Sequence, residues 1–493
     1  MAIDLSSLVK AYDVRGVVPD QLSPVVAEAL GAAFARVVVL PDAEAGAGTG
    51  AGAARPGMVI GRDMRDSGPG LVDAFARGVT AAGVDVTLIG LCSTDGLYFA
   101  SGSLGVPGAM FTASHNPARY NGIKLCRSGA RPVGQDTGLA QVRELAQDYL
   151  DNALPEPVEA AGQVSERDVL AEYAGFLRSL VDLSGIRPLK VVVDAGNGMG
   201  GLTVPAVLGE AAGLAGLPLE VVPLFFELDG TFPNHEANPL EPANLIDLQA
   251  AVVANEADLG LAFDGDADRC FVVDERGGAV SPSAVTALVG LAEVSKELAA
   301  GRAPTVIHNL ITSRAVPDLL SAAGAETVRT RVGHSFIKAQ MAQHGAVFGG
   351  EHSAHYYFRD FWFADTGMLA ALHVLAALGT QEHSMSELAE MFEPYVGSGE
   401  INSTVPDAAA ATERVLDAYR AAYPEVVVDT LDGVTVSHWE SHPQWWFNLR
   451  ASNTEPLLRL NVEAADEDIM EKVRDDVLSL VREPVPTEEE ETP

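Results

Sequence analysis

Cysteine is scarce in this chain of 493 residues: the three that occur, Cys92, Cys126 and Cys270, are odd in number and far apart. A disulfide framework needs paired cysteines and a zinc site needs closely spaced ligands, so we expect neither. No apolar run approaches the length of a membrane span, and residues 1–10 lack the long apolar stretch of a signal peptide. We therefore expect a cytoplasmic protein without membrane attachment.

Basic residues are also few. Lys and Arg number 32 against 68 Asp and Glu, which gives a formal net charge of −36. Binding to nucleic acid through a general surface needs clustered Lys and Arg, so the composition argues against a nucleic-acid partner. Part of the acidity lies in residues 484–493, where four successive Glu and three Pro indicate a disordered acidic tail.

A hydroxyl follows the short apolar run 108–111, in a tight polar turn at residues 112–117 (TASHNP). A serine on such an exposed loop, Ser114, can be phosphorylated. Ten residues further along the chain, Lys124 follows a second turn and supplies a cation that can fold back towards the serine. The pair is typical of a phosphotransfer site, although Ser, Asn and Pro also form ordinary turns for purely conformational reasons.

Three carboxylates, Asp264, Asp266 and Asp268, alternate directly after the apolar run 259–262. Hard carboxylate oxygens favour Mg²⁺ or Ca²⁺, and Mg²⁺ suits a site that also binds phosphate oxygen. The spacing imitates an EF-hand loop, but Arg269 stands where that loop requires Gly, and strand-like runs flank the acids where an EF-hand has helices. We therefore predict a Mg²⁺ site.

Two further segments carry groups that suit a sugar phosphate. Residues 349–355 (GGEHSAH) supply a carboxylate, a hydroxyl and imidazoles, the mixture of donors and acceptors that vicinal sugar hydroxyls require. Residues 450–456 (RASNTEP) follow a strand-like run and offer a guanidinium, two hydroxyls and an amide, which favours binding of a dianion. By itself the second segment is equally typical of a hairpin loop.

The four motifs, in this order and over nearly the whole chain, resemble those of the α-D-phosphohexomutase family, in its phosphomannomutase/phosphoglucomutase branch. Residues 12–16 (YDVRG) and 332–335 (VGHS) match two further segments of that family. The resemblance implies that Ser114 carries the resting phosphoryl group and completes a Mg²⁺ shell formed by Asp264, Asp266 and Asp268. It also implies catalytic roles for Arg15, His115, Lys124, Arg269 and His334, and substrate-binding roles for Tyr12, Glu351, Ser353, His355, Arg450, Ser452, Asn453 and Thr454.

The implied activity is that of a phosphomannomutase, an isomerase of carbohydrate metabolism. It interconverts mannose 6-phosphate and mannose 1-phosphate, and also accepts glucose phosphates, through a phosphoserine enzyme and a hexose 1,6-bisphosphate. Close relatives often have Met and Gly where this chain has His352 and Ala354, so phosphoglucomutase and phosphoglucosamine mutase stay open as alternatives. The general base stays open among Lys124, His334 and His355. A non-catalytic sugar-phosphate-binding relative is disfavoured, because the serine and the acids are intact.

A hexose phosphate is an anion, and so is this protein. The few cations must therefore gather at the substrate, which predicts that Arg15, Lys124, Arg269 and Arg450 face one cleft. The hexose phosphates are the expected partners of a monomer or a homodimer.

The length predicts several domains. Short apolar strands that end in polar or acidic residues alternate with helical stretches, and after residue 400 strands dominate, with two helices among them. We predict three similar mixed α/β domains plus a C-terminal α+β domain around a central cleft. The ranges are residues 1–160 with the phosphoserine loop, 161–277 with the metal loop, 278–395 with the sugar loop and 396–483 with the phosphate-binding loop.

Two segments receive no role in the reaction. The Ala/Gly tract at 41–57 is interpreted as a flexible surface insertion. Residues 194–201 (DAGNGMGG) satisfy the pattern G-x-G-x-x-G, which suggests a dinucleotide-dependent dehydrogenase. Since no acid clearly ends the next strand at the usual distance, we prefer glycines that allow tight strand-to-helix packing.

Overall fold

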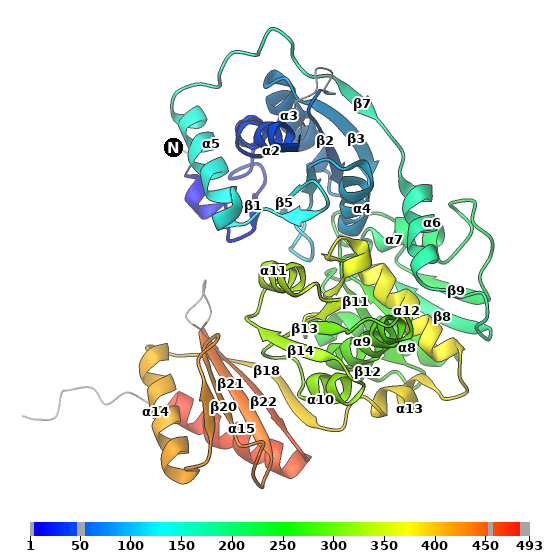
Figure 1. Ribbon diagram of the computed structural model, residues 1–493, viewed down its shortest axis with the longest axis vertical. Helices are drawn as coiled ribbons and strands as arrows, with labels where there is room; N and C mark the ends of the chain where they lie inside the picture. Colours follow the sequence, from blue (N-terminus) through cyan, green and yellow to red (C-terminus); the bar gives the residue numbers. More distant parts are fainter. Residues whose placement is uncertain (1–3, 47–54, 452–456, 484–493) are drawn as a thin grey trace, which may run out of the picture.

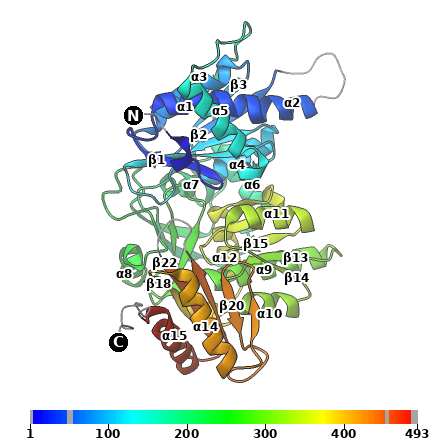
Figure 2. The same ribbon diagram turned by 90° about the vertical axis from the view of Figure 1, so that its left-hand side faces the viewer.

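A computed structural model describes residues 4–46, 55–451 and 457–483, which form four β-sheets in succession along the chain. Figure 1 shows the first domain at one end of the long axis and the fourth at the other, with the second and third between them. The view from the side in Figure 2 keeps this order. The predicted fold class, three α/β domains and a C-terminal α+β domain, is confirmed.

The first sheet has the strand order β1-β5-β4-β2-β3-β7, with β6 beside β5. Its strands are β1 (Asp13–Val17), β2 (Gly57–Arg62), β3 (Asp85–Leu91), β4 (Gly108–Phe111), β5 (Tyr120–Arg127), β6 (Arg131–Pro132) and β7 (Val164–Glu166). Its helices are α1 (Pro24–Phe34), α2 (Leu40–Gly46), α3 (Gly68–Ala81), α4 (Thr94–Leu104) and α5 (Leu139–Asp151). The strands β2, β3 and β4 are parallel, whereas β5 is antiparallel to β1 and β4.

The second sheet has the order β12-β11-β10-β8-β9. Its strands are β8 (Leu189–Asp194), β9 (Leu219–Leu224), β10 (Leu259–Phe263), β11 (Cys270–Asp274) and β12 (Ala279–Val280), and its helices are α6 (Leu170–Leu180), α7 (Gly200–Val207) and α8 (Ile246–Ala254). All five residues of β10 are buried, as is typical of a central strand covered on both faces.

The third sheet has the order β14-β13-β15-β16-β17. Its strands are β13 (Thr305–Asn309), β14 (Glu326–Thr330), β15 (Phe348–Gly350), β16 (Tyr356–Phe358) and β17 (Ala364–Asp365). Its helices are α9 (Pro282–Ala299), α10 (Ala315–Ala322), α11 (His334–His344), α12 (Gly367–Gly379) and α13 (Met385–Glu390). Each of the first three sheets thus has parallel strands on one side and antiparallel strands on the other.

The fourth sheet is antiparallel throughout, with the order β18-β22-β21-β20-β19. Its strands are β18 (Val396–Thr404), β19 (Val427–Asp429), β20 (Val434–Ser437), β21 (Trp445–Ala451) and β22 (Leu457–Ala464). The helices α14 (Ala408–Ala422) and α15 (Glu467–Arg482) begin at aspartate caps, Asp407 and Asp466, whose carboxylates accept from backbone N–H groups of the first turn.

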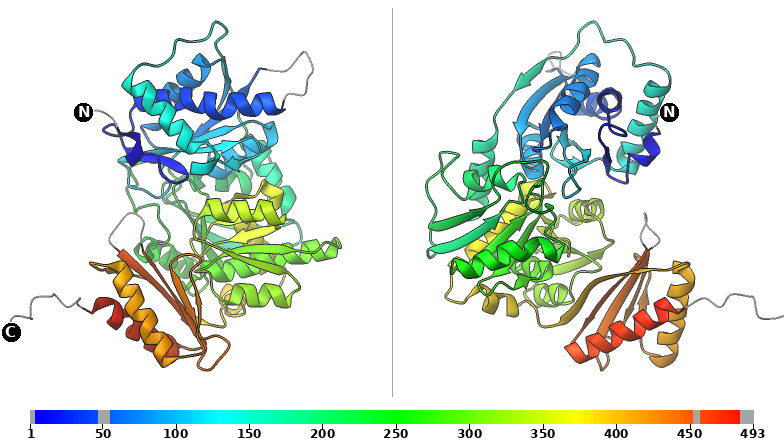
Figure 3. Two further views of the ribbon diagram at one scale, coloured as in Figure 1. Left: turned by 60° about the vertical axis from the view of Figure 1, so that its left-hand side comes forward. Right: turned by 180° about the vertical axis from the view of Figure 1, so that it is seen from behind.

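Hydrophobic packing divides the molecule differently from the sheets. One continuous core joins the second and third domains to one side of the first, whereas the fourth domain has a core of its own. In both views of Figure 3 the fourth domain stands apart from the first. Polar contacts connect it to the third domain, among them the Glu463 carboxylate accepting from the Arg314 N–H at 2.8 Å.

Several expectations about segments differ from the structure. The strand β7 pairs with β3, so the first sheet extends beyond the predicted boundary at residue 160, and β12 pairs with β11 beyond residue 277. Part of the tract 41–57 is helix α2, because Ala favours helix; residues 47–54 lie outside the described residues, as does the predicted tail 484–493.

The expectation that no apolar run approaches a membrane span is wrong on length and composition. The helical segment Pro24–Ala45, which comprises α1, the π-helical turn Ala35–Val39 and α2, is 22 residues long and passes that test. In the most apolar 18-residue stretch of this segment, 61% is buried in the first domain, where α1 packs against α3 and α5. Such burial is typical of a core helix. All three cysteines are free and buried.

Candidate active site

The acidic loop joins β10 to β11, two antiparallel neighbours in the second sheet. Asp264, Asp266 and Asp268 are buried, and one oxygen of each carboxylate lies within 4.8 Å of those of the other two. Strands on both sides exclude the EF-hand arrangement, which needs helices there. A Cβ atom on Gly265 would lie 2.5 Å from the carbonyl oxygen of Ser114, so a glycine is required where the acidic loop and the serine loop meet.

Ser114 lies between β4 and β5 with a φ of 50°, and its hydroxyl points at the acidic loop. The Ser114 N–H donates to Thr112 Oγ1 at 2.8 Å, and Ser114 Oγ donates to Asp264 Oδ2 at 2.8 Å. The expectation of an exposed serine is wrong, because the acidic loop of the second domain covers the residue and leaves it 5% exposed. The Ser114 hydroxyl therefore already contacts one predicted metal ligand.

Arg65, which the sequence motifs did not single out, lies beneath the serine loop and is 1% exposed. Its guanidinium pairs with the buried Asp63 at 3.2 Å. Its remaining N–H groups donate at 2.7–3.0 Å to the carbonyls of Ser114, Asn116, Pro117 and Tyr120. A planar guanidinium with five N–H donors suits this task. We therefore infer that Arg65 maintains the conformation of the serine loop.

Lys124 reaches from β5 into the acidic loop. Its Nζ donates to Asp266 Oδ2 at 2.7 Å and to Asp268 Oδ2 at 2.5 Å. Burial by itself lowers the pKa of Lys124, but the two carboxylates outweigh burial and raise that pKa well above its usual range. The other oxygen of each carboxylate, Oδ1, is buried and has no hydrogen-bond partner among the described residues. Two such oxygens beside Asp264 fit a hard cation such as Mg²⁺.

Arg269 and His115 complete the surroundings of the serine. Arg269 donates from Nε to Asp264 Oδ2 at 2.9 Å and from Nη2 to His115 Nδ1 at 2.6 Å. Burial, together with the Arg269 charge, lowers the pKa of His115 to about 2, so the ring is neutral and Nδ1 accepts. Burial raises the pKa of Asp264 to about 7, although Arg269 opposes this effect.

A cavity of about 140 Å³ opens between the first three domains at this point. Nine of the residues predicted for the site line it: Tyr12, Arg15, Ser114, His115, Lys124, Asp268, Arg269, His334 and His355. Sequence reasoning missed the other three, Asp13, Tyr98 and Asp365. The Tyr12 and His334 rings meet edge-on with centroids 4.1 Å apart, which joins the first and third domains. Burial lowers the pKa of His334 well below its usual range.

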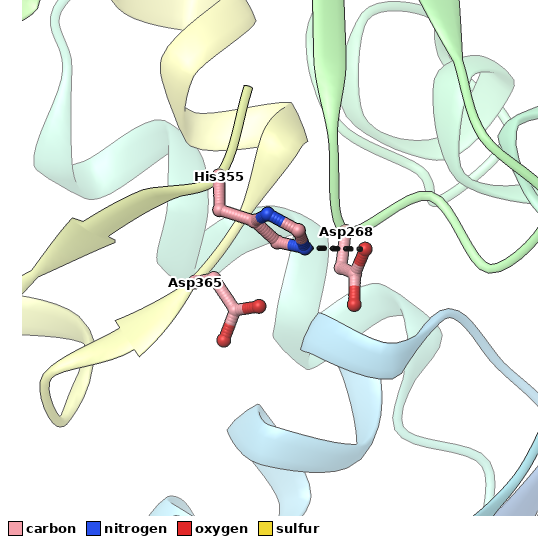
Figure 4. Close-up of side chains that lie close together, drawn as sticks. All are labelled: Asp268, His355 and Asp365. Carbon is pink, nitrogen blue, oxygen red and sulfur yellow. Dashed lines mark ion pairs between the residues drawn. The ribbon is translucent and has the colours of Figure 1, made fainter. Parts of the chain in front are cut away.

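His355 lies between carboxylates from two domains (Figure 4). Its Nε2 is 3.8 Å from Asp268 Oδ1, and its Nδ1 is 3.7 Å from Glu351 Oε2 and 3.0 Å from Ser353 Oγ. Figure 4 also shows the Asp365 carboxylate beside the ring. The imidazole therefore connects the acidic loop of the second domain to the sugar loop of the third.

A buried lysine balances Asp365. Lys338, from α11, is 3% exposed, and its Nζ lies 2.5 Å from Asp365 Oδ1 and 4.3 Å from the centroid of the Tyr98 ring. Asp268, His355 and Asp365 also lie close enough together to suggest a second metal site. The Lys338 ammonium already neutralises Asp365. We therefore infer that these three residues shape the wall of the cavity rather than bind a second metal ion.

Glu351, predicted to grip sugar hydroxyls, does not line the cavity formed by the described residues. It is 2% exposed, and its oxygens accept from Asn309 Nδ2 and the Gly333 N–H at 3.2 Å and from Tyr357 Oη at 2.6 Å. In this arrangement the Glu351 carboxylate fixes the position of the sugar loop through these hydrogen bonds. His352 lines a separate hollow of about 630 Å³ beside the fourth domain.

Comparisons with known proteins agree with this geometry. Models of the phosphoglucomutase/phosphomannomutase α/β/α domains I, II and III match residues 6–151, 171–278 and 282–395, and the model of the C-terminal domain matches residues 400–480. A phosphomannomutase from Escherichia coli is 38% identical over 480 residues, which cover 96% of this chain and 98% of that one. The chain belongs to the phosphoglucomutase/phosphomannomutase family.

Other members are as similar. Phosphohexose mutases from Xanthomonas campestris pv. campestris are 39% identical over 477 residues, with 96% of this chain and 98% of that one covered. A solved structure of a phosphoglucomutase/phosphomannomutase family protein from Burkholderia thailandensis matches with a TM-score of 0.79 and 30% identity over 97% of each chain. The protein is therefore an isomerase of the phosphohexomutase class, as the motifs predicted.

The C-terminal motif of this family member is placed only in part. Arg450 is the second-last residue of β21, and its Nη2 lies 3.5 Å from Glu400 Oε2, away from the lining of the 140 Å³ cavity. The predicted phosphate ligands Ser452, Asn453 and Thr454 lie outside the described residues.

Within residues 194–201, Gly198 and Gly201 lie against the backbone of other segments. A Cβ on Gly198 would lie 2.7 Å from the Gly265 carbonyl oxygen, and one on Gly201 would lie 2.1 Å from that of Phe226. The absence of a side chain at Gly198 lets the chain pack against the acidic loop. At Gly201 it lets α7 approach the end of β9. Close packing therefore accounts for the last two glycines of the pattern, whereas the first, Gly196, has a positive φ of 51°.

Proposed function

We propose that this protein is a phosphomannomutase that interconverts mannose 6-phosphate and mannose 1-phosphate and also accepts glucose phosphates. One observation carries the phosphoserine mechanism. Ser114 Oγ contacts Asp264 at 2.8 Å, beside Lys124, Arg269 and two buried carboxylate oxygens that have no hydrogen-bond partner among the described residues. The preference for mannose rests on the names of the similar proteins.

In the proposed reaction, phosphorylated Ser114 transfers its phosphoryl group to the free hydroxyl of the sugar monophosphate. The bond between phosphorus and Ser114 Oγ breaks, a bond to the sugar oxygen forms, and the hydroxyl proton passes to a general base. The resulting hexose 1,6-bisphosphate turns over in the site and returns its other phosphoryl group to Ser114. Asp264, Asp266, Asp268 and the phosphoserine would hold Mg²⁺, which would neutralise charge on the transferring group.

Among the three candidates for the general base, we propose His355. It lies between the acidic loop and the sugar loop, within 4 Å of Asp268 and Glu351. Lys124 already donates to two carboxylates and is suited to act as a cation. His334 packs against Tyr12 at the rim of the same cavity. Arg15, Arg269 and His115 orient the serine loop, and the two arginines offset phosphate charge.

The cavity of about 140 Å³ is small for a hexose with two phosphates, so we propose that the fourth domain completes the site. Arg450, with Ser452, Asn453 and Thr454, would bind the phosphate that does not react, once this domain moves towards the first. We further propose a cytoplasmic enzyme, which three buried free cysteines support, acting as a monomer or a homodimer.

A coupled assay with mannose, glucose and glucosamine 1-phosphates, each with catalytic hexose 1,6-bisphosphate, tests the substrate. We expect the highest kcat/KM with mannose 1-phosphate. Preference for glucosamine 1-phosphate would replace the assignment by phosphoglucosamine mutase. Absence of turnover with all three sugars, from protein whose intact mass shows no phosphate, would favour a non-catalytic sugar-phosphate-binding protein.

A further inference from the structure

The start of α4, in the first domain, contacts the acidic loop of the second. Thr94 is fully buried, and it meets Asp266 twice. Its N–H donates to the Asp266 carbonyl oxygen at 3.0 Å, and its Oγ1 donates to Asp266 Oδ2 at 2.6 Å. Neither residue type nor spacing marks Thr94 in the sequence, because its partner lies 172 positions away.

These contacts distinguish the two oxygens of the Asp266 carboxylate. Oδ2 accepts from both Thr94 Oγ1 and Lys124 Nζ, at 2.6 and 2.7 Å. Oδ1 is buried and has no hydrogen-bond partner among the residues that the structure describes. Rotation of the carboxylate would break both bonds at once, so Oδ1 is the oxygen presented to a cation.

The neighbouring residue fixes Thr94 in place. Asp95 Oδ1 accepts from Ser93 Oγ. Asp95 Oδ2 accepts from Tyr173 Oη and from Thr366 Oγ1, both at 2.7 Å. Tyr173 belongs to α6, and Thr366 begins α12 of the third domain. Three domains therefore hold the first turn of α4, and Thr94 cannot leave Asp266 without disturbing all three.

We propose that Thr94 is a positioning residue for Mg²⁺: it orients Asp266 so that Oδ1 binds the ion, and so sets the affinity of the site. This inference rests on the Mg²⁺ site of the proposed function. A residue that orients a metal ligand typically changes metal affinity by about 10- to 100-fold when it is removed. Thr94 differs from Lys124 in adding no charge, so its effect is orientation alone.

The test is calorimetric titration of Mg²⁺ into substrate-free enzyme. We expect Thr94→Val, which keeps the volume and removes the hydroxyl, to raise the Kd by about tenfold or more, and Thr94→Ser to stay within about threefold. The matched control is Thr203→Val, since Thr203 is a buried threonine whose Oγ1 donates only to the Met199 carbonyl of its own helix region. It should bind Mg²⁺ as the wild type does.

Steady-state kinetics give a second test, because a general structural defect would not change the Mg²⁺ requirement alone. Thr94→Val should need more Mg²⁺ for half-maximal activity, while its KM for the sugar phosphate stays unchanged. A wild-type Kd in Thr94→Val would overturn the positioning role and leave the Mg²⁺ site intact; wild-type protein that binds no Mg²⁺ would instead overturn the site itself. Should Thr94→Val not fold, Thr94→Ala against Thr94→Ser decides the same point, because the smaller side chain cannot clash.

Discussion

Asp95 should contribute less to the stability of this protein at neutral pH than in mild acid. Its carboxylate is fully buried, and burial raises its pKa from 3.8 to about 6, although hydroxyl donors from Ser93, Thr366 and Tyr173 oppose the rise. The negative charge of Asp268 raises it further. No cation pairs with Asp95 among the residues that the structure describes, so the folded state favours the protonated acid.

The sign and size follow from proton linkage. Between pH 3.8 and about 6 the folded protein binds a proton that the unfolded chain has released, so stability falls as pH rises through this window. Above pH 6 both states are ionised and the loss is complete. A gap of about two pH units corresponds to roughly 3 kcal/mol, at about 1.4 kcal/mol per unit.

The variant Asp95→Asn mimics the protonated acid at every pH. We expect its free energy of unfolding, minus that of the wild type, to rise by about 2 kcal/mol between pH 4.5 and pH 7.5 and then to level off. Urea unfolding at fixed ionic strength measures this difference, and most other titrating groups cancel in it. The matched control is Asp73→Asn, an exposed aspartate of α3, whose difference should be flat. A flat or falling difference for Asp95→Asn would refute the reasoning.

Four further outcomes are expected. Arg65→Met should lower the free energy of unfolding by about 3–5 kcal/mol, because it leaves Asp63 buried without its partner, and hydrogen exchange should rise in the serine loop; Arg65→Lys should recover only part. Ser114→Ala should lose nearly all mutase activity and its phosphate adduct in intact-mass analysis, with stability changed by about 1 kcal/mol at most; substantial activity in this variant would rule out the phosphoserine. Asp266→Asn should weaken Mg²⁺ binding and turnover together, and full activity after chelation would contradict the metal assignment. Arg450→Ala should raise KM and lower kcat, whereas a loss in kcat/KM below about twofold, or roughly 0.5 kcal/mol, would make residues 450–456 an ordinary hairpin.

The sequence predicts those parts of the site that follow a strand end. The acidic loop comes directly after β10, and the serine loop directly after β4, so an apolar run followed by polar residues locates both. Carboxylates at alternate positions then indicate a hard cation without knowledge of the fold. Ser114, Lys124, Arg269 and His355 accordingly meet in one cavity.

The missed residues act across the chain rather than within a motif. Arg65 donates to carbonyls about 50 positions away, and Thr94 and Asp95 bond to residues 78 to 271 positions away. Such partners are set by how the domains pack, which residue spacing does not encode. The contacts of Glu351 were also missed: Tyr357 and Gly333 donate to its oxygens, and neither contact follows from the sugar-loop sequence.

Local errors have local causes. Helix α2 was not predicted because a glycine-rich stretch follows it. The residues before those glycines include Ala, the strongest helix former. Strand β7 has three exposed residues and no apolar alternation, so only its pairing with β3 reveals it. Edge strands of this kind depend on a neighbour that periodicity cannot show.

The division of the hydrophobic core suits the two demands of the proposed reaction. Phosphoryl transfer needs Ser114 and the acids to hold one geometry, and both lie where three domains share a continuous core and are bound together by Asp95. Reorientation of a bisphosphate needs a contact that can be released and remade. The fourth domain has its own core and meets the third through contacts such as Glu463 to Arg314 and the rings of Tyr395 and Trp439, so it can move without breaking the core that the other three share. Placing Arg450 on that domain therefore separates the part of the site that must stay fixed from the part that must let the substrate turn.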